Sequence, residues 1–480
     1  MRRHGLGAFA GLLVLVAACS PAQSAAPSGA GATSGTQPTG GASSAGSSAA
    51  AGGEITFWTA EDNEQRVTAT KAIVDRFVSA TGIKVTTVAV AEDQLQAQIA
   101  SAAAGDTLPD VFGALSLGFT HQLNVDKIAD PAAAAAVVDA LGRDTFSARA
   151  LELVTADGDL VGVPSDSWAQ LLVYRKDLFE AASLQPPNTF ANIQAAAEKL
   201  NEGDVAGIVA ATGPADSFTQ QTFEYFALAN GCQLTDDAGN ITLSSQQCID
   251  TFKFYTDLIT KGSVTGLQDA DTTRAAYFAG KAGMIVWSSF VLDELAGLRN
   301  DALPTCSECT GDKLFLAKNS GVVTGISGPS GQPTQFGELV SFTITQGGNT
   351  AAAQEFVKFM MSDGYVDWLG LAPEGKFPTR LGTAENATEY ADAWAGLQAG
   401  VDEKKPLGEL YPADVIDTLT KSTDTMSRWG FAQGQGALVG PLLGQNTIPK
   451  ALGDALDGSA TPEEAAQQAQ EEVEDIKAGL

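Results

Sequence analysis

The chain has 480 residues, of which 44% are hydrophobic, so it is long enough to bury the cores of two or three ordinary domains. Its 57 acidic residues outnumber the 28 basic ones and give a formal net charge of -29. A field of that sign repels nucleic acid and anionic membrane surfaces, which argues against polyanionic partners without identifying a ligand.

The N-terminus has the composition of an export signal. Arg2 and Arg3 precede the apolar run 8–18, which has the length of a secretory h-region and is too short to span a bilayer. The run closes on VAACS, whose small residues before Cys19 resemble the bacterial lipoprotein signal, in which that cysteine is lipidated. An ordinary cleaved signal with an incidental cysteine is the alternative. We expect 1–19 to be a lipoprotein signal peptide that ends at lipidated Cys19 and holds the protein on the extracytoplasmic face of the cell membrane.

Residues 20–53 contain almost nothing but Ser, Ala, Gly, Thr, Pro and Gln. Such a segment cannot bury a core, so we expect a disordered tether. A flexible chain of this length has a root-mean-square reach on the order of 30 Å. The tether therefore leaves the folded body free to move above the membrane.

From Glu54 onward, strand and helix patterns alternate, which favours an α/β fold with mostly parallel sheets flanked by helices. The first pattern is a strand at 54–58, a helix at 67–82 and an alternating strand at 83–90. Gly82 suits a left-handed helix C-cap. An amphipathic helix around Leu95 and Ile99, a turn and the apolar run 111–115 follow, as in a right-handed βαβ unit.

Cap residues predict three further helices. Thr189 precedes a helix at 190–200, and Ser244 with Gln247 forms a capping-box pattern. Thr461, followed by Pro462 and Glu464, opens the last helix. The apolar residues of that last helix recur at helical spacing and predict one packed stripe: Ala466, Ala469, Val473, Ile476 and Leu480.

Four cysteines follow the signal, an even number that favours disulfides in an exported protein. We predict the local pairs Cys232–Cys248, which bracket a turn-like segment, and Cys306–Cys309. A redox or zinc site at 306–309 is the alternative. It is weaker, because histidine ligands are scarce after the signal and the surroundings do not read as a thioredoxin-like unit.

Catalytic motifs are mostly missing from the sequence. There is no phosphate-binding loop, since AGKAG lacks both the upstream glycine and the hydroxyl residue. A Ser-His-Asp site would have to use His121, and no nucleophile elbow accompanies it. Neighbouring carboxylates are a poor signal of glycosidase chemistry in so acidic a chain. We therefore expect no enzyme, no metal and no cofactor.

The order of segments resembles family 1 extracellular solute-binding proteins of ABC importers, and among these the sugar-binding lipoproteins. The segments that carry the resemblance run in register from about residue 54 to the C-terminus, and the most specific are VYRKDLFEAASLQPP and FAGKAGM. The resemblance implies a two-lobed periplasmic-binding-protein-like fold with hinge segments near 163–167, 321–328 and 371–373. One lobe would be 54–164 plus 328–371, and the other 165–327 plus 372–480.

The resemblance also indicates where a ligand would bind, in the cleft between the lobes. Sugar hydroxyls need carboxylate or amide partners, and the C–H face of a sugar stacks on aromatic rings. The ligand-binding residues we expect on this basis are Glu61, Asp62, Ser116, Trp168, Gln221, Trp287, Ser288, Phe290, Glu338 and Trp429.

Several of these positions have a competing structural interpretation. Glu61 and Asp62 fit a solvated loop equally well, and Gln221 fits an exposed glutamine. Trp429 and its neighbour Phe431 fit a core, whereas Trp58 and Tyr174 lie inside strands and are expected to pack. In GMIVWSSF the tryptophan stands earlier than in the resembling proteins and Phe290 takes the later place, so which ring meets the ligand stays open, with Trp287 and Ser288 preferred.

We interpret the chain as the membrane-tethered substrate-binding component of an ABC importer, which delivers a mono- or oligosaccharide to permease subunits. We expect a monomer that contacts the membrane only through its lipid and binds no nucleic acid. Two alternatives remain. One is an importer receptor for a non-sugar solute such as a polyamine, which an acidic cleft bearing aromatic rings would also suit. The other is an extracellular carbohydrate-active enzyme.

Overall fold

The computed structural model describes residues 53–480. The predicted signal peptide 1–19 with Cys19, and all but the last residue of the predicted tether 20–53, lie outside the described residues. The strands of the described part are β1 (Glu54–Thr59), β2 (Lys84–Ala89), β3 (Val111–Ser116), β4 (Thr155–Ala156), β5 (Asp159–Leu160), β6 (Val163–Arg175), β7 (Met284–Ser288), β8 (Ser320–Val323), β9 (Gln335–Ile344), β10 (Phe377–Pro378), β11 (Gln398–Ala399), β12 (Lys405–Pro406) and β13 (Met426–Ser427).

The helices vary from single turns to five turns. They are α1 (Glu64–Thr81), α2 (Glu92–Ala104), α3 (Leu117–Val125), α4 (Pro131–Leu141), α5 (Ala148–Leu153), α6 (Lys176–Ala181), α7 (Phe190–Leu200), α8 (Ser217–Ala229), α9 (Gln246–Gly262), α10 (Ala270–Phe278), α11 (Val291–Leu295), α12 (Phe315–Asn319), α13 (Thr350–Met360), α14 (Tyr365–Leu369), α15 (Glu389–Ala395), α16 (Leu407–Leu410), α17 (Ala413–Thr420), α18 (Ser422–Thr425), α19 (Val439–Gln445), α20 (Thr447–Asp457) and α21 (Pro462–Gly479). Short 3-10 turns include η3 (Glu308–Thr310), η4 (Pro373–Gly375) and η5 (Gly436–Leu438).

The main sheet has the path β10-β6-β9-β3-β1-β2, with β13 added to β9 and with β7 and β8 added to β6. β1 pairs in parallel with β2 and β3, as predicted for the first βαβ unit. β9 is antiparallel to β3 and to β6, and β6 is antiparallel to β7 and β8. The α/β class is therefore confirmed, but the sheet is mixed: outside β1–β3 and the short parallel β9–β13 pair, the expectation of mostly parallel sheets is wrong.

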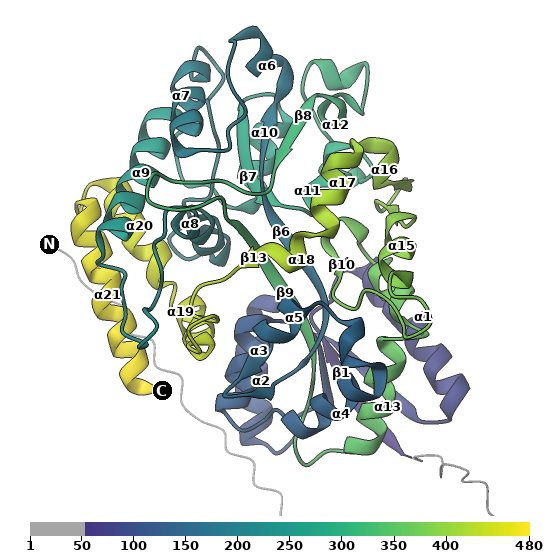
Figure 1. Ribbon diagram of the computed structural model, residues 1–480. Coiled ribbons are helices and arrows are strands. Elements are labelled where there is room, and N and C mark those ends of the chain that lie inside the picture. The colour runs from purple at the N-terminus through teal and green to yellow at the C-terminus, as the bar shows by residue number, and fades with distance from the viewer. Residues whose placement is uncertain (1–52) are drawn as a thin grey trace, which may run out of the picture. The chain divides into compact units, whose positions relative to one another are not determined.

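The antiparallel pairing follows from the two long strands of the sheet. β6 has 13 residues and pairs with β9 along its first half and with β7 and β8 along its second half. Figure 1 shows β6 and β9 side by side in the middle of the structure, between the helices of its two ends. Two short strands extend this pair, since β10 runs antiparallel to β6 and β13 runs parallel to β9.

Helix ends follow the predicted caps with one exception. Thr189 accepts a hydrogen bond from the Asn192 amide, and Gly82 is left-handed with φ 76°. Thr461 forms a full capping box with Glu464. At α9 the N-cap is Ser245 rather than Ser244, and no side-chain cap forms. The Ser244 amide donates to Gln470 of α21 and not to Gln247 as a capping box requires.

The core contains the apolar stripes of these helices. The predicted stripe of α21 is buried from Ala466 to Ile476, whereas Leu480 is 52% exposed because it follows the last helical residue. Phe57 of β1 and Phe77 of α1 pack edge-on against Phe356 of α13, which fixes the βαβ unit to the rest of its layer. No helix within residues 53–480 has both the length and the apolar composition needed to cross a bilayer.

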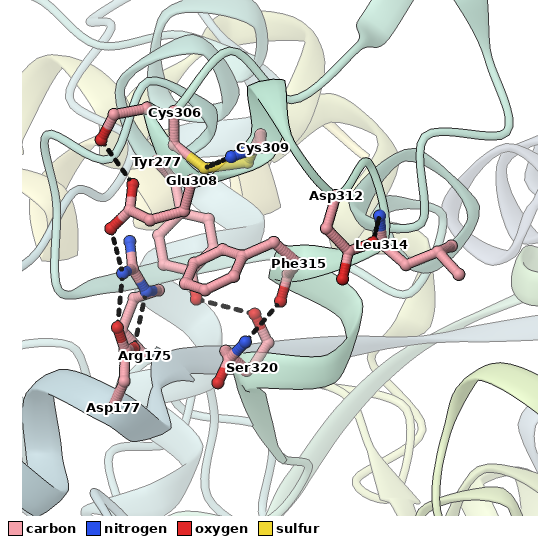
Figure 2. The surroundings of a disulfide bond; sticks show 12 residues. Arg175, Asp177, Tyr277, Cys306, Glu308, Cys309, Asp312, Leu314, Phe315 and Ser320 are labelled. Carbon is pink, nitrogen blue, oxygen red and sulfur yellow. Dashed lines mark hydrogen bonds and ion pairs between the residues drawn. A yellow bond between two sulfur atoms is a disulfide. The ribbon is translucent and has the colours of Figure 1, made fainter.

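Both predicted disulfides are present. Cys232 pairs with Cys248 and Cys306 pairs with Cys309. Figure 2 shows the second bond beside Arg175, whose guanidinium bonds to Asp177 at 2.6 Å and to Glu308 at 3.3 Å. Burial lowers the pKa of Arg175, but the carboxylate of Asp177 outweighs it, so the net pKa is raised. The 306–309 loop is therefore attached to the far end of β6.

Candidate ligand-binding site

A cavity of about 400 Å³ opens beside the paired strands β6 and β9. Its wall combines carboxylates, two cations and four aromatic rings from elements far apart in the sequence. The side chains used below are Glu61, Arg66, Ser116, Asp166, Trp168, Asp216, Phe218, Gln221, Trp287, Ser288, Phe290, Glu338 and Lys376.

Two irregularities in the strands shape this wall. The β3–β9 register shifts between Phe112 and Leu115, and Ala114 within the shift is left-handed with φ 56°. The β6–β9 register shifts between Pro164 and Asp166. Bulges re-aim the side chains that follow them, and a non-glycine residue at positive φ is a strained conformation that is concentrated at functional sites. Ser116 and Asp166 both reach the cavity next to these bulges.

A buried ion network forms one side of the cavity. The Lys376 ammonium lies 2.5 Å from Glu61 and 3.2 Å from Asp166, and Arg66 lies 3.1 Å from Glu61. Asp166 also accepts a hydrogen bond from the Trp368 indole at 2.7 Å. Burial raises the pKa of Glu61, but the charges of Lys376 and Arg66 outweigh it and the net pKa is lowered. Burial lowers the pKa of Lys376, but the charges of Asp166 and Glu61 outweigh it and the net pKa is raised.

A second buried network fixes Glu338. One of its oxygens accepts a hydrogen bond from the Leu117 amide at 3.1 Å, and the other lies 2.5 Å from Arg428. Arg428 also bonds to Glu224 at 3.1 Å. Burial raises the pKa of Glu224 despite the opposing charge of Arg428. Carboxylates held in this way are pre-organised acceptors whose geometry does not depend on a ligand.

The aromatic rings are held by separate contacts. The Trp287 indole donates to the Ala270 carbonyl at 3.0 Å, and its ring lies 6.0 Å from Phe218 between centroids. Trp168 lies 6.0 Å from Phe336. Phe290 packs beneath Arg66, whose guanidinium carbon is 5.1 Å from the ring centre. All four cavity rings are only partly buried, so each leaves apolar surface open to the cavity.

Acidic groups with few partners lie behind Phe290. Both oxygens of Asp293 and one oxygen of Glu374 are buried without a hydrogen-bond partner. Burial raises the pKa of Glu374 to about 8, aided by the charge of Asp293, and burial raises the pKa of Asp293 to about 6. Glu374 also borders a smaller cavity of about 160 Å³ that shares Arg66 with the main one.

The structure brings together most of the residues selected from the sequence. The cavity contains Glu61, Ser116, Trp168, Gln221, Trp287, Ser288, Phe290 and Glu338. Trp287 and Phe290 both line it, so which ring meets a ligand stays a prediction. Trp58 packs edge-on against Phe112 and Tyr174 packs against Phe179, as expected.

Two selected residues lie elsewhere. Asp62 is exposed outside the cavity, because the chain turns away after Glu61 toward the start of α1. Trp429 is fully buried, and its indole donates to the Cys232 carbonyl at 2.9 Å. It packs near Phe223, so the core interpretation of Trp429 is the correct one.

Sequence reasoning missed five charged or aromatic lining residues: Arg66, Asp166, Asp216, Phe218 and Lys376. Arg66 lies in the first turn of α1, five residues after the non-helical Glu61, so no helical spacing links the two. Asp166 lies two residues before Trp168 on the same strand face, which is a readable signal. Lys376 has no such signal, since only the fold brings it against Glu61.

The arrangement suits binding better than catalysis. Three of the four lining carboxylates are occupied by cations, which leaves them as hydrogen-bond acceptors rather than as a general acid and base. Among residues 53–480 no group of three or more His, Cys, Asp or Glu side chains is placed to hold a metal ion. A larger cavity of about 650 Å³ lies between α9 and α20, but its wall has no aromatic ring.

The sequence matches a known protein family and a curated relative. Residues 61–305 match the family model described as bacterial extracellular solute-binding protein. YcjN of Escherichia coli (strain K12) is 27% identical over 405 residues, which cover 83% of this chain and 88% of YcjN. YcjN is named as a putative ABC transporter periplasmic-binding protein.

Two solved structures share the fold. The GacH receptor of Streptomyces glaucescens GLA.O, described with acarbose, has a TM-score of 0.67 at 19% identity, covering 88% of this chain and 98% of its own. Maltose-bound T. maritima MalE3 has a TM-score of 0.67 at 19% identity, covering 88% and 100% of the two chains. These likenesses show the two-lobed α/β fold.

Proposed function

Because the chain belongs to the bacterial extracellular solute-binding protein family, we propose that it captures a mono- or oligosaccharide in the β6–β9 cavity for an ABC importer. Membership of this family makes it a binding protein rather than an enzyme. The importer role is supported by the similarity to YcjN. The choice of a sugar is supported by the sugars bound in the structures that share the fold.

The observation that carries the proposal is the pairing of open aromatic rings with fixed carboxylates in one cavity. Trp168, Trp287 and Phe290 offer apolar faces on which a sugar ring can stack. Glu61, Asp166 and Glu338 are rigid acceptors, so hydroxyl donors need no costly reorganisation on binding. A hydroxyl-rich ring with apolar C–H faces satisfies both parts of the wall.

We further propose that the lobes are 54–164 plus 328–371 and 165–327 plus 372–480. With this division, three cavity contacts join one lobe to the other: Glu61 to Lys376, Arg66 to Phe290 and Glu338 to Arg428. A ligand that touches both walls would stabilise the closed arrangement, which a transporter could then recognise.

We also propose that lipidated Cys19 and the tether 20–53 keep the folded body near its permease. The support is the sequence pattern of the signal and the composition of the tether. A Cys19→Ala variant should be recovered from the culture medium while the wild type stays with the membrane fraction. Equal partition of the two proteins would remove the anchor from the proposal.

The sugar proposal is tested by thermal shift with panels of mono- and oligosaccharides and of polyamines. We expect stabilisation by a sugar and none by an amine, and stabilisation only by amines would overturn the assignment. For the sugar that binds, Trp287→Ala should weaken the Kd by about tenfold or more, which equals about 1.4 kcal/mol. Trp58→Ala is the matched control, because Trp58 is also a partly exposed tryptophan but lies outside the cavity.

A further inference from the structure

All but one of the carboxylates that line the cavity have an ion-pair partner. Lys376 pairs with both Glu61 and Asp166, Arg66 pairs with Glu61, and Arg428 pairs with Glu338. Asp216 has no cation within ion-pair distance among the described residues. Each of the other three lining carboxylates has at least one such partner.

The surroundings of Asp216 add no positive charge to it. Its side chain caps α8 by accepting a hydrogen bond from the Phe218 amide at 2.9 Å. Burial raises the pKa of Asp216, and the nearby Asp269 carboxylate raises it further. Arg274 lies over the Trp287 ring, but its guanidinium is bonded to Asp271 at 2.6 Å and to Glu294 at 3.0 Å.

From this geometry we propose that Asp216 is a specificity-determining residue that makes the cavity accept neutral and amino sugars and reject sugars bearing a carboxylate or phosphate. This inference rests on the proposed sugar function. Phe218 and Trp287 lie on the same wall, so a ring stacked there brings its substituents toward the Asp216 carboxylate. A hydroxyl or ammonium substituent donates to that carboxylate, whereas an anionic one is repelled.

A ligand-independent experiment measures the charge at this wall. Iodide and acrylamide quench the fluorescence of Trp287, whose contribution is isolated by subtracting the Trp287→Phe protein. At constant ionic strength, Asp216→Asn should raise the iodide quenching constant relative to acrylamide by about twofold or more, since a unit charge changes the local anion concentration on this order. Asp237→Asn is the control, because Asp237 is exposed and far from the cavity wall. An unchanged ratio in Asp216→Asn overturns the proposal.

A second experiment uses matched sugars. The Kd values of wild type and Asp216→Asn are measured for glucose, glucosamine and glucuronic acid, and for the corresponding disaccharides. The variant should lower the preference for neutral over anionic sugar by about tenfold, and its preference for glucosamine should also fall. Equal preferences in the two proteins refute the inference while leaving the sugar function standing. Failure of every sugar to bind would instead refute the proposed function, and the quenching ratio would still decide the charge at Asp216.

Discussion

Lys376 offers the sharpest test of how the site is held together. Its side chain is 3% exposed, and its ammonium is the only cation within ion-pair distance of Asp166 among residues 53–480. Replacing it by methionine removes one partner of a buried ion network, which typically costs about 3–5 kcal/mol. We expect a value near the lower end, about 3 kcal/mol, because Glu61 keeps Arg66 and Asp166 keeps the Trp368 indole.

The assay is urea unfolding of the ligand-free protein at several pH values. In the wild type the lowered pKa of Glu61 adds stability above the pKa of the unfolded side chain, and this stability is lost as the pH falls. In Lys376→Met, a carboxylate buried without its cation gains from protonation. The difference between the two proteins should therefore be largest near pH 7 and smaller near pH 4.

The control is Lys71→Met, which breaks the exposed pair between Lys71 and Asp75 and should cost about 0–1 kcal/mol. The reasoning would be refuted if Lys376→Met were no more destabilising than Lys71→Met near pH 7. It would also be refuted if the difference from wild type grew as the pH fell.

Three further predictions concern other parts of the structure. Because the pKa of Glu374 is raised to about 8, the free energy of unfolding should decline as the pH rises from about 4 to about 8 and this buried carboxyl loses its proton. Glu374→Gln should make that decline shallower, and parallel pH profiles of the two proteins would contradict the prediction. Replacing Cys232 and Cys248 by serine should lower the free energy of unfolding by about 3 kcal/mol for a bond of sequence separation 16, measured by urea denaturation, and no change would contradict the loop-entropy argument. In Gly375→Ala the added Cβ would overlap the Phe290 ring, so sugar affinity measured by calorimetry should fall more than in Gly408→Ala, where the added Cβ meets no atom.

Much of the architecture could be predicted from local patterns. The first βαβ unit, the caps at Thr189 and Thr461, and both disulfides are visible in short stretches of sequence. The antiparallel course of β9 could not be predicted in this way, since no local pattern states in which direction a strand crosses the sheet. The cap predicted at Ser244 was also wrong: the N-cap is Ser245, and the Ser244 amide is bonded to a helix more than two hundred residues away.

Some residues of the site could likewise be predicted from local sequence and others could not. Glu61, Trp168 and Trp287 stand at strand ends or crossings, where position along the chain implies position in space. Trp429 carries the same aromatic signal, yet it lies in the core, because composition does not reveal on which side of a segment a ring points. Lys376 has no local signal at all, since its role comes only from the carboxylates that the fold places against it.

The unbroken course of β6 limits how the sequence of this protein can change. Asp166 and Trp168 face the cavity from alternate positions in the first half of the strand, and Gln170 continues that face and bonds to Thr222 of α8. Inserting or deleting one residue between the two halves would reverse the inward and outward faces of one of them. Changes in chain length are thus tolerated in surface loops and excluded from this strand. The length of β6 fixes the position of the residues it pairs with on β9 relative to those it pairs with on β7.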